Sequence, residues 1–219
     1  MLLFSMVAHE YAHGYAALRQ GDDTALKLGR LTLNPLKHID PFMTVLLPGL
    51  MLLASHGTMA IGGAKPVPVD PRNYRRLRRG DIIVSLAGVA TNLVLAIVAA
   101  GLTFVFGAIG GSVPAVAPSM GILQAMFMIA VLLNLALIAF NLIPIPPLDG
   151  SHVFKYILPP ALSLRYQRLG FAGLFILILL LNTRLFAWWM SPVYAAFVTL
   201  ERQLLATGFL LPAAAELLK

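Results

Sequence analysis

The chain has 219 residues, of which 59% are hydrophobic and only 11% are charged. A soluble domain carries about 25% charged residues, so this composition excludes an ordinary water-exposed surface and indicates a polytopic membrane protein. The net charge is +7, but the basic residues flank apolar stretches, which is typical of a topology signal. We therefore expect a lipid bilayer and no nucleic acid as partner. The absence of cysteine excludes disulfides and thiolate metal ligands.

In chain order, apolar stretches close to the ~20 residues of a helical span predict core helices at about 1–20, 82–109 and 120–143. A shorter apolar segment at about 41–57 is interrupted by Pro48-Gly49, and a proline-rich run from Pro144 must end the third core helix. Further helices are predicted at about 169–190 and 192–211, the last as a surface helix or a final span. We expect a single all-α membrane domain over 1–219, with a three-helix catalytic core and additional C-terminal helices.

The first predicted helix contains a zinc-binding pattern. His9 and His13 are four residues apart, which places both imidazoles on one helix face, one turn apart. His-Glu-x-x-His binds zinc with this spacing, and its glutamate, here Glu10, is the general base. A carboxylate at bilayer depth costs a few kcal/mol or more. That expense favours a functional role over a cluster that only hydrogen-bonds to neighbouring helices.

Two histidines do not complete a catalytic zinc site, which usually has three protein ligands and a water. Asp149 is the best-placed third ligand, because the proline break before it frees the backbone to turn a carboxylate inward. The other available side chains lie in loops and are His38, Asp40, His56 and His152.

Three motifs in order resemble the site-2 protease family of intramembrane zinc metalloproteases, from residue 1 to about 190. They are His9-Glu10-x-x-His13, Ala87-Gly88-x-x-x-Asn92 and Asn141-Leu-Ile-Pro144-Ile-Pro146-Pro147-Leu148-Asp149-Gly150. The resemblance implies one Zn²⁺ per chain, a catalytic glutamate and two asparagines near the substrate or its oxyanion. By the same resemblance, the zinc ligands are His9, His13 and Asp149, the base is Glu10, and the two asparagines are Asn92 and Asn141. Interhelical hydrogen bonding is the alternative role for the asparagines. Val89 departs from the proline that many relatives have there.

The resemblance also implies an activity: a zinc endopeptidase that cleaves in or near transmembrane segments of membrane-protein substrates, in regulated intramembrane proteolysis. A non-catalytic metal-binding scaffold or a transporter is the alternative. A transporter should carry ionisable residues along a path through the bilayer, and a scaffold has no need of Glu10. The stretch 61–67 resembles the family's edge-strand region, with an ordinary polar loop as the alternative, and an edge strand near 62–69 could hold a substrate by strand addition.

The zinc site constrains the topology. If 41–57 crossed the bilayer, the two half-sites would lie on the order of 15 Å apart in a ~30 Å core. Zinc bonds are about 2 Å long, so a site split in this way could not close. We therefore expect this segment to be re-entrant or interfacial. All ten Lys and Arg from Arg19 to Arg79 then share one side with Lys155, Arg165 and Arg168. That positive-inside pattern predicts a multi-pass protein of the plasma or inner membrane, with its active site in the cytoplasmic half of the bilayer.

Overall fold

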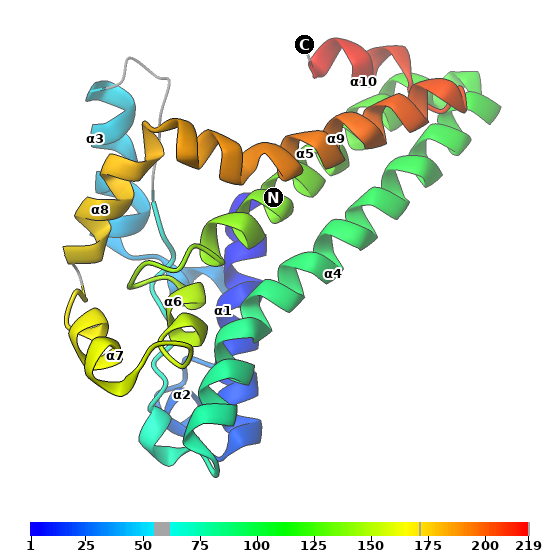
Figure 1. Cartoon of the computed structure of the whole chain (residues 1–219). Coiled ribbons are helices and arrows are strands. Elements are labelled where there is room, and N and C mark those ends of the chain that lie inside the picture. The colour runs from blue at the N-terminus through cyan, green and yellow to red at the C-terminus, as the bar shows by residue number, and fades with distance from the viewer. Residues whose placement is uncertain (55–61, 171, 219) are drawn as a thin grey trace. The chain divides into compact units, whose positions relative to one another are not determined.

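A computed structural model describes residues 1–54, 62–170 and 172–218. The chain divides into two compact units, Leu2–Thr91 and Asn92–Lys219, the second also including Met1. The division falls inside one long helix, α4 (Leu77–Ser112), which continues without a break through Val89 (Figure 1). The described residues form helices and no strand, as expected for an all-α protein. The short strand expected near 61–67 is therefore not formed by the part of that stretch that is described, 62–67.

The N-terminal unit is built from short helices around α1. Gly21 ends α1 with a φ of 113°, a conformation that glycine adopts easily and other residues do not. An irregular connecting segment, residues 62–70, leads into the turn before α4. The elements of this unit that precede α4 are α1 (Leu2–Gln20), α2 (Thr24–Lys27), η1 (Pro35–His38), η2 (Pro41–Leu46), α3 (Leu47–Ala54) and η3 (Pro71–Asn73).

Asp22 ties the end of α1 to the turn that precedes α4. Its carboxylate is 1% exposed. It accepts hydrogen bonds from the backbone N–H and hydroxyl of Thr24, from the Asp70 N–H at 2.7 Å and from Asn73 Nδ2 at 2.9 Å. Burial raises the pKa of Asp22, but these hydrogen bonds outweigh burial and hold the pKa below its ordinary value. The start of α4 is thereby fixed against α1.

Several backbone N–H groups of the connecting segment 62–70 are already bonded within the protein. The Lys65 N–H donates to the His38 carbonyl at 2.7 Å, and the Val67 N–H donates to Glu10 at 2.7 Å. Pro66 and Pro68 have no N–H to donate. A substrate that paired with this stretch as an added strand would therefore find few backbone N–H donors along it.

The C-terminal unit packs its last helices back onto α5. It contains the remainder of α4 and then η4 (Pro114–Val116), α5 (Ala117–Asn141), α6 (Asp149–Phe154), α7 (Pro160–Gln167), α8 (Ala172–Leu181), α9 (Arg184–Ala206) and α10 (Pro212–Leu217). Gln124, fully buried on α5, donates to the carbonyls of Thr103 and Phe209 and accepts from the Leu211 N–H. These bonds determine the path of the tail, which the sequence left open between a surface helix and a span.

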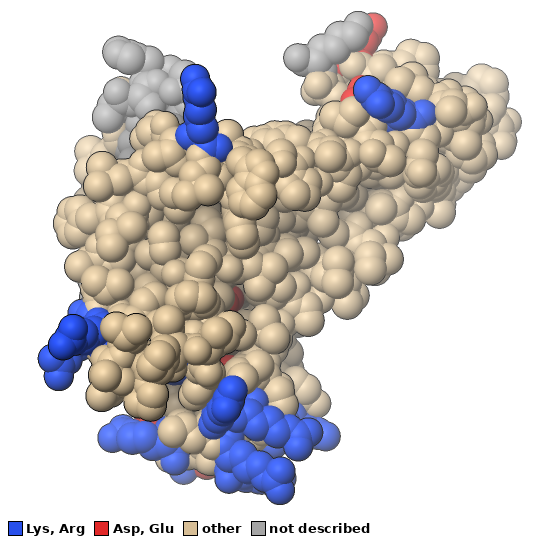
Figure 2. All heavy atoms as spheres, viewed as in Figure 1, with Lys and Arg blue, Asp and Glu red and all other residues tan. Residues whose placement is uncertain are grey.

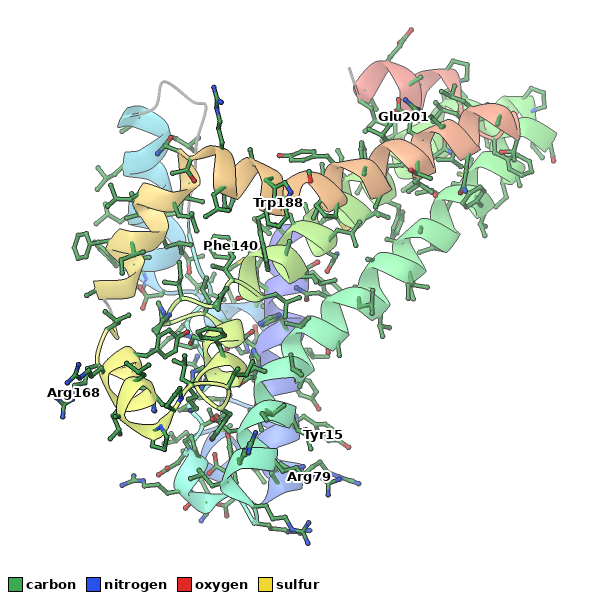
Figure 3. The ribbon with its side chains drawn as sticks, in the orientation of Figure 1. Tyr15, Arg79, Phe140, Arg168, Trp188 and Glu201 are labelled. Atoms are coloured by element: carbon green, nitrogen blue, oxygen red, sulfur yellow. The ribbon has the colours of Figure 1, made fainter. Side chains whose placement is uncertain are left out.

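The helix expected at about 169–190 is two helices. α8 ends at Leu181, and α9 begins after Thr183, whose hydroxyl accepts a hydrogen bond from the Phe186 N–H at 3.3 Å. Such N-capping starts a new helix within an apolar stretch. The paired tryptophans of α9 then face different surroundings, since Trp188 is exposed (Figure 3) and Trp189 donates to the Ala139 carbonyl at 2.7 Å.

Among the described helices, α4 and Pro114–Asn141 are long and apolar enough to cross a membrane. The bent pair α7 and α8 adds a third if it is counted as one span. α1 contains Glu10, Arg19 and two histidines and is not among them, so the three-helix membrane core stays a prediction. The re-entrant segment at 41–57 also stays a prediction, and its residues 55–57 lie outside the described part of the chain.

Basic side chains of the N-terminal unit gather where α4 begins (Figure 2). The exposed members at the start of this helix are Arg75, Arg76, Arg78 and Arg79, and Figure 3 labels the last of them. Such a cluster at one end of an apolar helix is the kind of charge bias that sets the orientation of membrane helices.

Candidate metal centre

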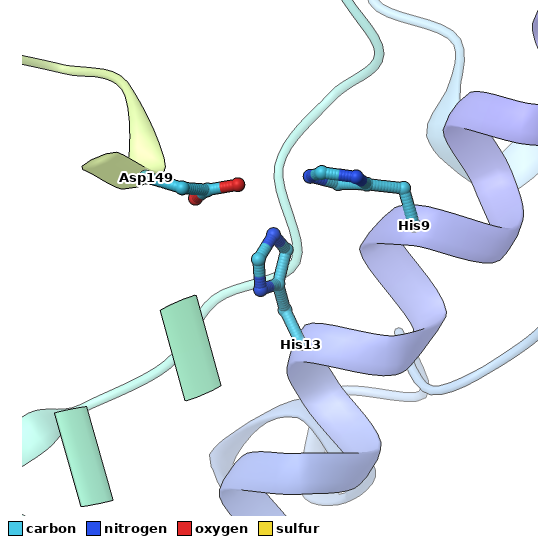
Figure 4. Close-up of side chains that lie close together, drawn as sticks. All are labelled: His9, His13 and Asp149. Atoms are coloured by element: carbon cyan, nitrogen blue, oxygen red, sulfur yellow. The ribbon is translucent and has the colours of Figure 1, made fainter. Parts of the chain in front are cut away.

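His9 and His13 project from the same face of α1, as the spacing predicts (Figure 4). Their ring centroids are 4.5 Å apart, and the ring planes lie at 82° to each other. His9 is buried and His13 is half-buried. Two imidazoles this close, with different ring orientations, can present nitrogen lone pairs to a common point.

The common point lies against Gly88 on α4. A Cβ atom added at Gly88 would be 2.5 Å from Nε2 of His9 and 2.7 Å from Nε2 of His13. Both Nε2 atoms therefore face a position on α4 that has no side chain. This explains the glycine of the Ala87-Gly88 motif, because any larger residue would displace the two imidazoles.

One turn earlier on α4, the carbonyl of Val84 accepts a hydrogen bond from Nδ1 of His13 at 2.7 Å. A carbonyl can only accept, so Nδ1 carries the proton and Nε2 keeps its lone pair. Metal-binding histidines almost always have such a partner on the second nitrogen, which fixes the ring and its tautomer. α4 thus both orients His13 and leaves room for an ion.

Glu10 lies next to His9 on α1 and is half-buried. Its Oε2 accepts the Val67 N–H of the connecting segment at 2.7 Å. A carboxylate in this position can take a proton from a water and return it to a leaving group. The sequence analysis did not predict that the Val67 N–H holds this carboxylate or that the Val84 carbonyl holds His13. Both groups belong to the backbone, so no residue type indicates them.

Asp149 is the first residue of α6 in the C-terminal unit (Figure 4). α5 ends at Asn141, and the proline-rich run that follows turns the chain, as predicted. Gly150 is required next to Asp149, because a Cβ there would collide with the carbonyl of Leu142. The carboxylate is half-buried and offers one oxygen ligand, as His9 and His13 each offer one nitrogen.

The other possible third ligands have different roles or lie elsewhere. His38 is fully buried, and its Nε2 donates to the Thr32 carbonyl at 2.8 Å. Asp40 accepts from the Phe42 N–H at 2.9 Å, His152 lies inside α6, and His56 falls outside the described residues. In the described part of the chain, none of His38, Asp40 and His152 belongs to a group of three possible metal ligands.

The donor set fits zinc. Two imidazole nitrogens and a carboxylate oxygen are ligands that Zn²⁺ takes in hydrolytic sites, with a fourth position left for water. The cradle at Gly88 and the fixed Nδ1–H tautomer of His13 are what such a site requires of the two histidines.

Asn92 and Asn141 both lie in the C-terminal unit. Asn92 is fully buried, and neither its amide oxygen nor its nitrogen has a hydrogen-bond partner among the described residues. Asn141 donates to the Leu137 carbonyl of its own helix at 2.9 Å. Asn134, which the sequence analysis did not single out, is also buried on α5, and its Nδ2 donates to the Ala130 carbonyl at 2.8 Å.

Comparison with known proteins gives a consistent result. The family model described as Peptidase family M50 matches residues 1–181. YwhC of Bacillus subtilis is 39% identical over 195 residues, which cover 89% of this chain and 84% of that protein. Rip2 of Mycolicibacterium smegmatis is 34% identical over 202 residues, 89% of this chain and 70% of that protein. The names of both contain the words zinc metalloprotease. No solved structure matches the chain.

Proposed function

The chain belongs to peptidase family M50, the site-2 protease family, and from this premise we propose which residues carry out its chemistry. The family indicated by the three motifs is confirmed, and with it the class: an intramembrane zinc metalloprotease. We assign His9, His13 and Asp149 as the ligands of one zinc ion and Glu10 as the general base.

The observation that supports the zinc ligands most directly is the position of the two Nε2 atoms over Gly88. The Nδ1–H tautomer of His13 adds support, because it leaves Nε2 as a ligand. Asp149 is proposed as the third ligand from its donor chemistry and from the turn that Gly150 permits beside it.

When bound, zinc lowers the pKa of a water towards ~7 and polarises the peptide carbonyl. Glu10 would accept the proton of the attacking water and later donate it to the amine of the departing peptide. Asn92 and Asn141 are proposed to contact the substrate. The buried and unpartnered amide of Asn92 supports this role, since an amide N–H can donate to a developing oxyanion.

The protein is a membrane protein, and membrane-protein segments are the substrates that its family implies. We propose that 1–219 forms a single multi-pass protease domain of the plasma or inner membrane. The active site would lie in the cytoplasmic half of the bilayer, with 41–57 re-entrant. The basic cluster at the start of α4 supports this orientation. A transporter or a non-catalytic scaffold is not favoured by the family.

Glu10→Gln tests the assignment of the base. The full chain in micelles should keep its zinc and lose cleavage of a single-span substrate by about 100-fold or more, the usual contribution of a general base. Glu216→Gln makes the same chemical change at an exposed residue of α10 and should preserve both zinc and cleavage. Asp149→Asn should lose zinc if Asp149 is a ligand. Retained cleavage in Glu10→Gln would remove Glu10 from the mechanism.

A further inference from the structure

We infer that Arg30 is a positioning residue for Glu10, acting through the connecting segment 62–70. Arg30 binds the backbone of this segment and thereby holds the Val67 N–H on the catalytic carboxylate. The inference rests on the proposed role of Glu10 and adds a residue that lies twenty positions away from it in the sequence. All of the groups involved belong to the N-terminal unit.

Arg30 holds two consecutive peptide carbonyls. Its Nη2 donates to the Lys65 carbonyl at 3.1 Å and to the Pro66 carbonyl at 3.3 Å. Arg30 is half-buried, although both of these bonds lie at the surface. Guanidinium groups hold such paired acceptors well because several N–H donors project in fixed directions from one plane.

Two further contacts fix the same stretch of backbone. The Lys65 N–H donates to the His38 carbonyl at 2.7 Å, and Thr44 Oγ1 donates to the Gly63 carbonyl at 2.7 Å. Pro66 stiffens the chain between the anchors and Val67, because its ring fixes φ. Movement at Lys65 is therefore transmitted to Val67 rather than absorbed.

Val67 lies directly on α1. Its side chain is 5% exposed, and a Cβ added at Gly14 would be 2.8 Å from its Cγ1. Gly14 lies four residues after Glu10, so both are on the same face of α1. With its side chain seated over Gly14, Val67 directs its N–H to Oε2 of Glu10 at 2.7 Å. The position of Val67 thus determines where the carboxylate points.

The zinc ligands depend on other contacts. His9 and His13 face Gly88, and Val84 holds His13, so none of these contacts passes through Arg30. Loss of Arg30 should therefore misplace the base and leave zinc binding intact. A misplacement of about 1 Å can lower a rate by about 100-fold.

Amide hydrogen exchange on the zinc-free full chain in micelles tests the anchoring without any activity. Arg30→Ala should accelerate exchange at both Lys65 and Val67. Glu10→Ala should accelerate exchange at Val67 alone, since Lys65 donates to His38. Lys27→Ala is the control: it removes one positive charge three residues before Arg30, where Lys27 forms an ion pair with Asp23, and it should change neither amide. Unchanged exchange in Arg30→Ala would overturn the inference.

Cleavage kinetics test the consequence. Arg30→Ala should lower kcat by about tenfold or more, with KM, zinc content and melting temperature close to those of the wild type. Arg30→Lys should restore part of the loss, because an ammonium can reach one carbonyl. An unchanged kcat, or a change in KM alone, would contradict the role. The wild-type and Glu10→Gln chains are measured alongside. If Glu10→Gln keeps cleavage, the proposed function fails; if only Arg30→Ala behaves like the wild type, the inference about Arg30 fails.

Discussion

Gly88→Ala should abolish tight zinc binding without unfolding the protein. The added Cβ would lie 2.5 Å from Nε2 of His9 and 2.7 Å from Nε2 of His13, whereas ordinary contact begins at 3.4 Å. Relieving the overlap requires shifts of about 0.9 and 0.7 Å, the differences between these distances. Zinc–nitrogen bonds tolerate only about 0.2 Å around 2.0–2.1 Å. The two imidazoles would therefore no longer meet one ion, and we expect zinc affinity to fall at least about 100-fold, or ~2.7 kcal/mol.

The assay is competition for zinc between the purified full chain and a chelator of known affinity, with melting temperature measured on the same samples. Gly101→Ala is the matched control, since Gly101 lies on the same helix and an added Cβ there meets nothing within 4 Å. Alanine in place of glycine favours a helix by about 1 kcal/mol, so this control should bind zinc normally and melt no lower than the wild type.

Two results would refute the reasoning about Gly88. One is a folded Gly88→Ala protein that binds zinc as tightly as the wild type, which would mean that the ion does not lie against α4. The other is an equal loss of zinc in Gly101→Ala, which would mean that any change in α4 disturbs the site.

Two further predictions concern stability and topology. Asp22→Asn should lower stability at pH 7 by about 1–3 kcal/mol, because it weakens a buried, charge-assisted hydrogen-bond network. The folded-state pKa of Asp22 is lowered, so its contribution is present above the unfolded value of about 3.9 and is lost as pH falls through the lower folded value. The gap in melting temperature between wild type and variant should therefore narrow from pH 7 to pH 3, and a constant gap would contradict the assignment. Because the chain has no cysteine, single Cys residues report topology. A membrane-impermeant maleimide on intact cells should label Val113→Cys but not Lys27→Cys or Gly57→Cys. External labelling at residue 57 would disprove the re-entrant segment.

Local sequence patterns determined much of this protein. The low charge and the apolar stretches established the membrane class, and helical periodicity placed His9 and His13 on one face because residues four apart align on any α-helix. The proline run ended α5 and placed Asp149 at the start of the next helix, since proline cannot continue the hydrogen-bond pattern. These features depend on residues that are neighbours in the chain.

Contacts between distant residues were decided only by the tertiary structure. Val84 fixes the tautomer of His13 across 71 residues, and Val67 holds Glu10 across 57 residues. Both partners are backbone groups, which every residue has, so no side-chain pattern could identify them. The short strand expected near 61–67 is not formed in the described part, 62–67. The N–H groups of Lys65 and Val67 bind groups far away in sequence, which the sequence pattern could not indicate. The motif predicts His9 and His13 as ligands and Glu10 as the base, and only the tertiary structure shows that Val84 of α4 orients His13 and that Val67 of the connecting segment holds Glu10.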